Sequence, residues 1–194
     1  MRPSVFFAVF AVFAISILIL AGLSAVAEAS SAPVLAGPDL VRGKPVELSP
    51  GQAKKATVVV FLSASCPCSE SHEIRLKELA SEFSPAGVQF VAVHSNSDES
   101  ADLARAHFKS SELPFPVIQD DGAKIAIELK AFKTPHVFVF DPQGEILFQG
   151  GVDDSHIAAT AKKHYLREAL VAINEGKRPP ISEARTLGCI IKRP

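Results

Sequence analysis

Three hydrophobic runs predict the strands of a central sheet. Residues 56–62 (ATVVVFL) and 88–93 (VQFVAV) contain no charged residue. Continuous β-branched and apolar runs of this kind are typical of strands covered on both faces, as in parallel sheets. A third run at 136–140 (HVFVF) is followed by Asp-Pro-Gln-Gly at 141–144, with proline and glycine where a type I turn favours them. The segment 145–149 is therefore predicted to return as an antiparallel strand.

Helical periodicity separates these strands. After the first strand, one stripe of a helical wheel carries four side chains that a helix would bury, namely His72, Leu76, Leu79 and Phe83. Further helices are predicted at 101–109, 123–131 and 155–174, with a short extended piece at 115–119. Alternation of strands and helices predicts an α/β fold, a central mixed and mostly parallel sheet flanked by helices. We expect Asp153 and Asp154 to cap the last helix.

The N-terminal segment is unlike the rest of the chain. Between Arg2 and Glu28 no residue is charged, and the stretch ends in Ala25-Val26-Ala27 and Ala27-Glu28-Ala29. Both triplets have the small-x-small form that signal peptidase needs. An uncleaved anchor is the alternative, and a route to membrane attachment, because residues 5–26 are long enough to span a bilayer. In either case we expect the globular part in the periplasm or secreted.

Length and charge set the domain organisation. The chain has 194 residues, with 20 Lys and Arg against 21 Asp and Glu. This balance is unlike that of nucleic-acid-binding proteins. We divide the chain into a signal or anchor at 1–29, a linker with at most an edge strand at 30–52, a globular domain at 53–176 and a tail at 177–194. The sequence does not indicate an oligomeric state.

The cysteines are the first candidates for chemistry. Three are too few for a disulfide scaffold, and in an oxidising compartment thiols tend to pair or react. Cys66 and Cys68 flank Pro67, where the first strand gives way to a helix. Since proline suits the first helical turn, Cys66 is predicted near the N-cap, at the positive end of the helix dipole. This position lowers a thiol pKa and favours the nucleophilic thiolate. A buried structural pair is the alternative.

Several short motifs follow one another in a characteristic order, namely VVVFLSASCPCSE, Glu82-Phe83, Gly87-Val88, Phe115-Pro116-Val117, Thr134-Pro135, FDPQGEILFQG and Gly188-Cys189. From about residue 53 to the C-terminus the chain thereby resembles the thioredoxin fold. More closely it is similar to redoxins related to alkyl hydroperoxide reductase and thiol-specific antioxidant proteins. The resemblance implies that Cys66 is the attacking cysteine. It also implies that Pro135 follows a cis peptide bond and lies across from the sulfur, where Thr134 and Pro135 hold a substrate.

The chain departs from its relatives at several positions. Only Pro67 separates the two cysteines, whereas thioredoxin-like reductases have two residues there. A disulfide across one residue would be strained and therefore oxidising. Ser65 replaces the tryptophan of thioredoxins. Val59 and Ser63 replace a proline and a threonine that peroxiredoxins use to position peroxide. These departures favour thiol–disulfide exchange, with peroxide reduction as the alternative.

The role of Cys189 stays open at this point. It can resolve a sulfenate or mixed disulfide on Cys66 or Cys68, form a structural disulfide that links the tail to the domain, or form a disulfide between two molecules. Cys66, Cys68 and His136 are candidates for a soft copper site, because the cis-proline loop faces the reactive helix in this fold. The one-residue spacing fits such a site poorly, so no metal and no cofactor are expected. We expect His72, His94, His107, His156 and His164 to be surface or packing residues.

These observations together predict an exported thiol–disulfide oxidoreductase. Its catalytic residues are predicted to be Cys66, Cys68 and Cys189. Pro67, Thr134 and Pro135 are predicted to position the substrate. The expected partners are thiol- or disulfide-containing proteins or small thiols. A thiol peroxidase, a copper chaperone and a non-catalytic interaction domain are the alternatives.

Overall fold

The computed structural model describes residues 32–194, so the predicted signal or anchor at 1–29 lies outside the described residues. The helices are α1 (Pro67–Phe83), α2 (Ala101–Ser111), α3 (Lys124–Glu128) and α4 (Tyr165–Asn174). The strands are β1 (Leu35–Pro38), β2 (Pro45–Leu48), β3 (Ala56–Leu62), β4 (Val88–His94), β5 (Val117–Gln119), β6 (Lys133–Thr134), β7 (His136–Phe140), β8 (Ile146–Gly150) and β9 (Cys189–Ile190). Short 3₁₀ turns lie at Pro50–Gln52, Asp121–Ala123 and Ala158–Thr160. None of the helices in this part of the chain is long and apolar enough to cross a membrane.

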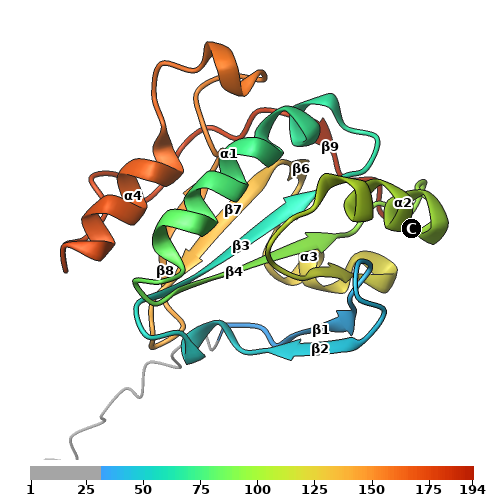
Figure 1. The fold of residues 1–194 in the computed structure, drawn as a ribbon, viewed down its shortest axis with the longest axis horizontal. Coiled ribbons are helices and arrows are strands. Elements are labelled where there is room, and N and C mark those ends of the chain that lie inside the picture. The colour runs from blue at the N-terminus through green and yellow to red at the C-terminus, as the bar shows by residue number, and fades with distance from the viewer. Residues whose placement is uncertain (1–31) are drawn as a thin grey trace, which may run out of the picture.

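A five-stranded sheet forms the centre of the molecule, in the order β5-β4-β3-β7-β8 (Figure 1). Strands β3, β4 and β5 run parallel, with α1 joining β3 to β4. Strand β7 lies inside the sheet and is antiparallel to both of its neighbours, β3 and β8. The α/β class and the mixed sheet predicted from the sequence are confirmed.

The two faces of the sheet are covered by different elements. Along β3, Val58 and Val60 pack on the face that α1 and α4 cover, whereas Val59 and Phe61 pack on the face covered by α3 and the β1–β2 hairpin. Figure 1 shows α1 crossing in front of the sheet. Every residue of β3 is buried, which explains why its sequence does not alternate between apolar and polar positions.

The structure differs from the predictions in two segments outside the main sheet. Within 30–52 it forms a hairpin, β1 paired with β2, instead of at most one edge strand. Helix α4 begins only at Tyr165, with His164 at its N-cap, so the predicted capping by Asp153 and Asp154 is wrong. The carboxylate of Asp153 is instead buried and accepts a hydrogen bond from Arg75 at 2.7 Å. A buried carboxylate needs such a charged partner.

The C-terminal tail returns to the centre of the molecule. Strand β9 pairs antiparallel with β6, in a register that places Thr134 opposite Cys189. After this strand, Ile191 is buried, and the carbonyl of Lys192 accepts a hydrogen bond from the Ser97 N–H at 2.8 Å. The tail therefore packs as part of the domain. It brings Cys189 to the N-terminal end of α1, beside Cys66.

Candidate functional site

Cys66 lies at the junction between β3 and α1. It is the N-cap residue of α1, with extended backbone angles, and Pro67 is the first helical residue, as predicted. The Cys66 side chain is buried, with 2% of the residue exposed, whereas Cys68 and Cys189 are half-buried. The local sequence fixes this junction, because proline has no N–H to lose at the first helical position.

The three thiols form one cluster. All three are free, and their sulfur atoms lie within 4.8 Å of one another. The Sγ atoms of Cys66 and Cys189 are 2.8 Å apart. These two residues are separated by 123 positions in the sequence. Of the roles left open for Cys189, the geometry therefore favours one within the same chain and directed at Cys66.

Thr134 and Pro135 lie across from Cys66. The Cys66 thiol donates a hydrogen bond to the Thr134 carbonyl at 3.2 Å. The Thr134–Pro135 bond is cis, as the resemblance implied. Thr134 is 1% exposed, and its hydroxyl has no hydrogen-bond partner among the described residues.

A glycine allows the tail to approach this segment. Gly188 has a φ of +143°, and a Cβ built on it would lie 2.0 Å from the Thr134 carbonyl oxygen. Only glycine fits a backbone contact this close. The pairing of β9 with β6 therefore depends on Gly188, which sets the position of Cys189 directly after it.

The thiols differ in acidity. Although burial raises the pKa of Cys66, hydrogen bonds that include those from Cys189 and from the Ser69 N–H in the first turn of α1 lower it to about 7. Burial and the hydrogen bond with Cys66 raise the pKa of Cys189 to about 12. Burial, followed by the charge of Cys66, raises the pKa of Cys68. Near neutral pH a substantial fraction of Cys66 is therefore thiolate, and thiolates are the nucleophiles.

Glu99 holds the loop that leads to Cys66. Its carboxylate accepts hydrogen bonds from the Ala64 N–H at 2.8 Å, the Ser65 N–H at 3.4 Å and the Ser63 hydroxyl. On its other side it lies 2.9 Å from Nε2 of His94. The sequence indicated only an acidic residue at a helix start, because nothing local shows that this loop reaches residues 63–65. Glu99 positions the loop and does not touch the sulfur atoms.

These contacts predict how stability depends on pH. Burial alone would raise the pKa of Glu99, but hydrogen bonds with His94, Ser63 and the Ala64 N–H lower it to about 2. Because the folded-state pKa lies below the ordinary value of 4.5, the stabilisation is complete above that pH and is lost as the pH falls toward 2. At neutral pH, Glu99→Gln is expected to lower the free energy of unfolding by about 1–3 kcal/mol. Denaturant titrations at several pH values measure the difference, which should shrink in acid.

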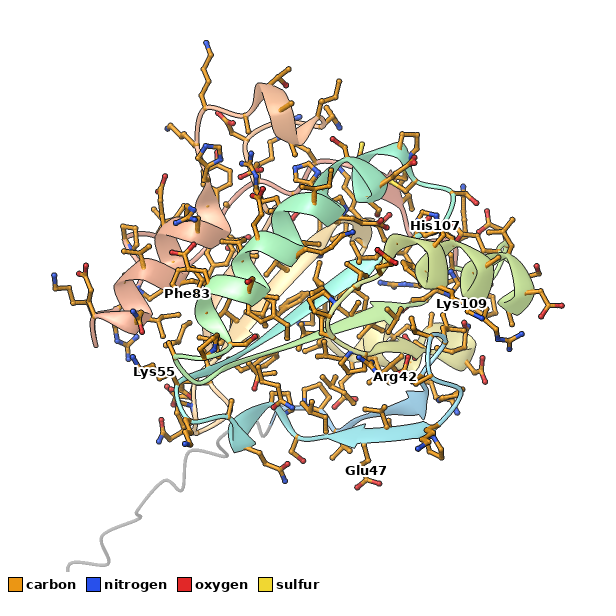
Figure 2. The ribbon with its side chains drawn as sticks, viewed as in Figure 1. Arg42, Glu47, Lys55, Phe83, His107 and Lys109 are labelled. Carbon is orange, nitrogen blue, oxygen red and sulfur yellow. The ribbon has the colours of Figure 1, made fainter. Side chains whose placement is uncertain are left out.

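Glu47→Gln is the matched control for this substitution. Glu47 lies on β2 and its side chain points into solvent (Figure 2). Its replacement is expected to change stability by less than about 0.5 kcal/mol. If Glu99→Gln costs no more than Glu47→Gln at neutral pH, Glu99 does not hold the loop.

Two histidines bear on the surroundings of the thiol cluster. His156 is exposed, as expected, and its Nδ1 lies 3.4 Å from Sγ of Cys68. His136 does not belong to the group that Cys66 and Cys68 form, so these three residues do not make a copper site. It projects from the face of β7 that carries Phe138, is 5% exposed, and lies against Phe132.

The burial of His136 has consequences for its charge. Burial lowers its pKa to about 4, so the ring is neutral at neutral pH. Its Nδ1 has no hydrogen-bond partner among the described residues. His136 lines a cavity of about 1070 Å³ to which none of the cysteines contributes. This cavity is therefore separate from the thiol cluster.

One family model and several solved structures are similar to this chain. The model described as Redoxin matches residues 27–164. An uncharacterized conserved protein from Geobacillus kaustophilus is 29% identical, with a TM-score of 0.77, over 84% of this chain and 90% of that one. A hypothetical protein from Sinorhizobium meliloti is 25% identical, with a TM-score of 0.75, over 84% and 93%. The thioredoxin domain of a thiol-disulfide oxidoreductase from Bacteroides vulgatus is 22% identical, with a TM-score of 0.52, over 60% and 83%.

These similarities confirm the thioredoxin-like fold. No curated protein is significantly similar to the chain. The range that the family model matches includes Cys66, Cys68 and the cis-proline segment, but it ends before Cys189. Cys189 thus lies outside the range that the family model matches.

Proposed function

Because the chain belongs to the Redoxin family, we propose that it is an exported thiol–disulfide oxidoreductase whose redox pair is Cys66 and Cys189. Membership of this family and the thioredoxin-like fold support thiol redox chemistry. The observation that carries the proposal is the 2.8 Å contact between the Cys66 and Cys189 sulfur atoms. The lowered pKa of Cys66 makes it the attacking member of the pair.

The proposed reaction proceeds in two exchange steps. The Cys66 thiolate attacks one sulfur of a substrate disulfide, forms a mixed disulfide, and releases the other substrate sulfur as a thiolate. Cys189 then loses its proton and attacks Sγ of Cys66. This forms the Cys66–Cys189 disulfide and releases the second substrate sulfur. The substrate disulfide gains two electrons and the protein dithiol loses two; the reverse sequence oxidises a substrate dithiol.

The acidity of the two thiols fits this order. The charge of the Cys66 thiolate contributes to the raised pKa of Cys189. Once Cys66 is in a mixed disulfide it carries no charge, so that contribution disappears and Cys189 ionises more easily. Attack by Cys189 is therefore favoured only after Cys66 has reacted.

The tail controls access to Cys66. Strand β9 covers the edge of β6 opposite Cys66, and Cys66 itself is buried. A small disulfide needs only a local opening, whereas an extended segment of a partner protein would have to take the place of β9 on β6. The proposed partners are thus small thiols and disulfides, and proteins that present a cysteine in an extended segment.

Peroxide reduction is less well supported. Ser63 stands where peroxiredoxins carry a threonine, and its hydroxyl donates to Glu99. A hydroxyl that is already engaged is poorly placed to orient a peroxide. Export is proposed from residues 1–29, whose uncharged apolar run and small-x-small ends are typical of a signal peptide.

An exchange assay on the chain without residues 1–29 tests the proposal. With dithiothreitol as the electron source, the protein is expected to accelerate reduction of the insulin disulfides and of oxidised glutathione, measured against dithiothreitol alone. Because Cys66 is nucleophilic at neutral pH, the acceleration should be present at pH 7. A folded protein that gives no acceleration with either substrate would be a non-catalytic interaction domain.

A further inference from the structure

The Cys66–Cys189 pair leaves the thiol of Cys68 without a part in exchange. Its sulfur nevertheless lies within 4.8 Å of both of the others. The three sulfur atoms come from two segments that are distant in sequence, the first turn of α1 and the tail strand β9. A disulfide uses two of these thiols, so the third sulfur remains beside them as an additional donor atom.

The size of the cluster suits a bound metal ion. Metal–thiolate bonds of about 2.3 Å place the sulfur atoms of a trigonal site about 4 Å apart. The three sulfur atoms already lie within 4.8 Å of one another, and Cys66 and Cys189 need only move apart from their 2.8 Å contact. Rotation of the half-buried Cys189 side chain provides that movement.

The donor set selects the kind of ion. Among the described residues, the atoms that all lie within this distance of one another are the three thiol sulfurs. Nδ1 of His156 lies 3.4 Å from the Cys68 sulfur but does not belong to this group. Thiolates are soft ligands that favour Cu(I) and Zn(II). Structural zinc sites use four protein ligands in a tetrahedron, whereas this cluster offers three. Three soft donors without a fourth therefore point to Cu(I).

We propose that Cys66, Cys68 and Cys189 in their reduced form bind one Cu(I) ion as three thiolates. Binding releases the thiol protons and transfers no electrons. The disulfide between Cys66 and Cys189 removes two of the three ligands, so copper binding and the oxidised state exclude each other. The site differs from the copper set considered from the sequence, because Cys189 takes the place of His136.

Titration of the reduced protein with Cu(I) tests this proposal. The chain without residues 1–29 is kept under anaerobic conditions, and Cu(I) is supplied from a complex with bicinchoninate, a chelator that reports the ion it has lost by its colour. We expect one Cu(I) per chain in the reduced protein and none in the oxidised protein. Failure of the reduced protein to take Cu(I) from the chelator, or equal binding by the oxidised protein, would overturn the proposal.

Variants identify the ligands. Cys68→Ser is expected to weaken Cu(I) binding by at least about 100-fold, because it removes a direct ligand. Ser65→Ala is the matched control, since Ser65 is an exposed residue of the same loop whose side chain makes no hydrogen bond to the cluster, and its affinity should stay within about threefold of that of the unmodified chain. Unchanged binding by Cys68→Ser, or an equal loss in both variants, contradicts a site of three thiolates.

The same samples separate this inference from the proposed function. Cys68→Ser retains the Cys66–Cys189 pair, so its exchange activity should survive while its copper binding is lost. A chain that exchanges disulfides but binds no Cu(I) overturns only the copper site. A chain that binds Cu(I) through its cysteines but exchanges no disulfides overturns only the proposed function.

Discussion

Replacement of Cys66 by serine is expected to slow thiol–disulfide exchange by at least about a thousand-fold. Serine is nearly the same size and can keep the hydrogen bond to the Thr134 carbonyl, which accepts from Cys66 at 3.2 Å. It cannot form a thiolate or a mixed disulfide, and both other thiols have raised pKa values. Burial, the largest cause of both raised pKa values, remains after the substitution, so we expect neither Cys68 nor Cys189 to take over the attack near neutral pH. The rate of insulin reduction with dithiothreitol measures this loss.

Cys68→Ser is the matched control for that experiment. It makes the same chemical change two residues away and leaves the Cys66–Cys189 contact in place. Its exchange rate is expected to stay within about threefold of that of the unmodified protein, because Cys189 and not Cys68 resolves the intermediate. Retained exchange in Cys66→Ser, or an equal loss in Cys68→Ser, would contradict the assignment of the redox pair.

Gly188→Ala is expected to slow formation of the internal disulfide by at least about 100-fold. The added Cβ would lie 2.0 Å from the Thr134 carbonyl oxygen, a contact with backbone that no rotation of a side chain relieves. Strand β9 must therefore shift away from β6 and carry Cys189 with it. A shift of about 1 Å at a reacting atom is enough for a loss of this size. The rate is measured by quenched alkylation after oxidised glutathione is added to the reduced protein.

Gly176→Ala provides a control at another glycine with a positive φ. Gly176 also has a positive φ, +73°, but nothing lies within 4 Å of a Cβ built on it. Both substitutions strain the backbone, and only Gly188→Ala displaces the tail. Equal rates of disulfide formation in the two variants would show that the close contact at Thr134 does not position Cys189.

The position of Cys66 could be predicted from the sequence because it depends only on neighbouring residues. A buried strand followed by Cys66 and Pro67 predicts a cysteine at a helix N-cap, and the structure has that arrangement. The order of short motifs likewise predicted a cis bond before Pro135, which the structure contains. Features of this kind depend on neighbouring residues, whose effects a single sequence shows directly.

The pairing of Cys66 with Cys189 could not be predicted in the same way. Cys189 is 123 positions away, and its place depends on pairing between two strands of two residues each. Such short strands carry almost no periodicity, so neither β6 nor β9 stands out in the sequence. The role of Glu99 was hidden for a related reason, because its contacts with residues 63–65 cross between two loops. His136 was misplaced because the cis-proline segment was assumed to direct it toward the helix.

Mapping of the disulfide in the oxidised protein tests the central claim most directly. Trypsin releases Cys66 and Cys68 together in the peptide 56–75 and Cys189 in the peptide 186–192. After oxidation, alkylation of free thiols and digestion without reductant, mass spectrometry should find these two peptides linked, with one alkylated cysteine in 56–75. Repetition with Cys68→Ser should give the same link, which assigns it to Cys66. If peptide 186–192 is instead found alone and alkylated, with a disulfide closed inside 56–75, the Cys66–Cys189 pair is wrong.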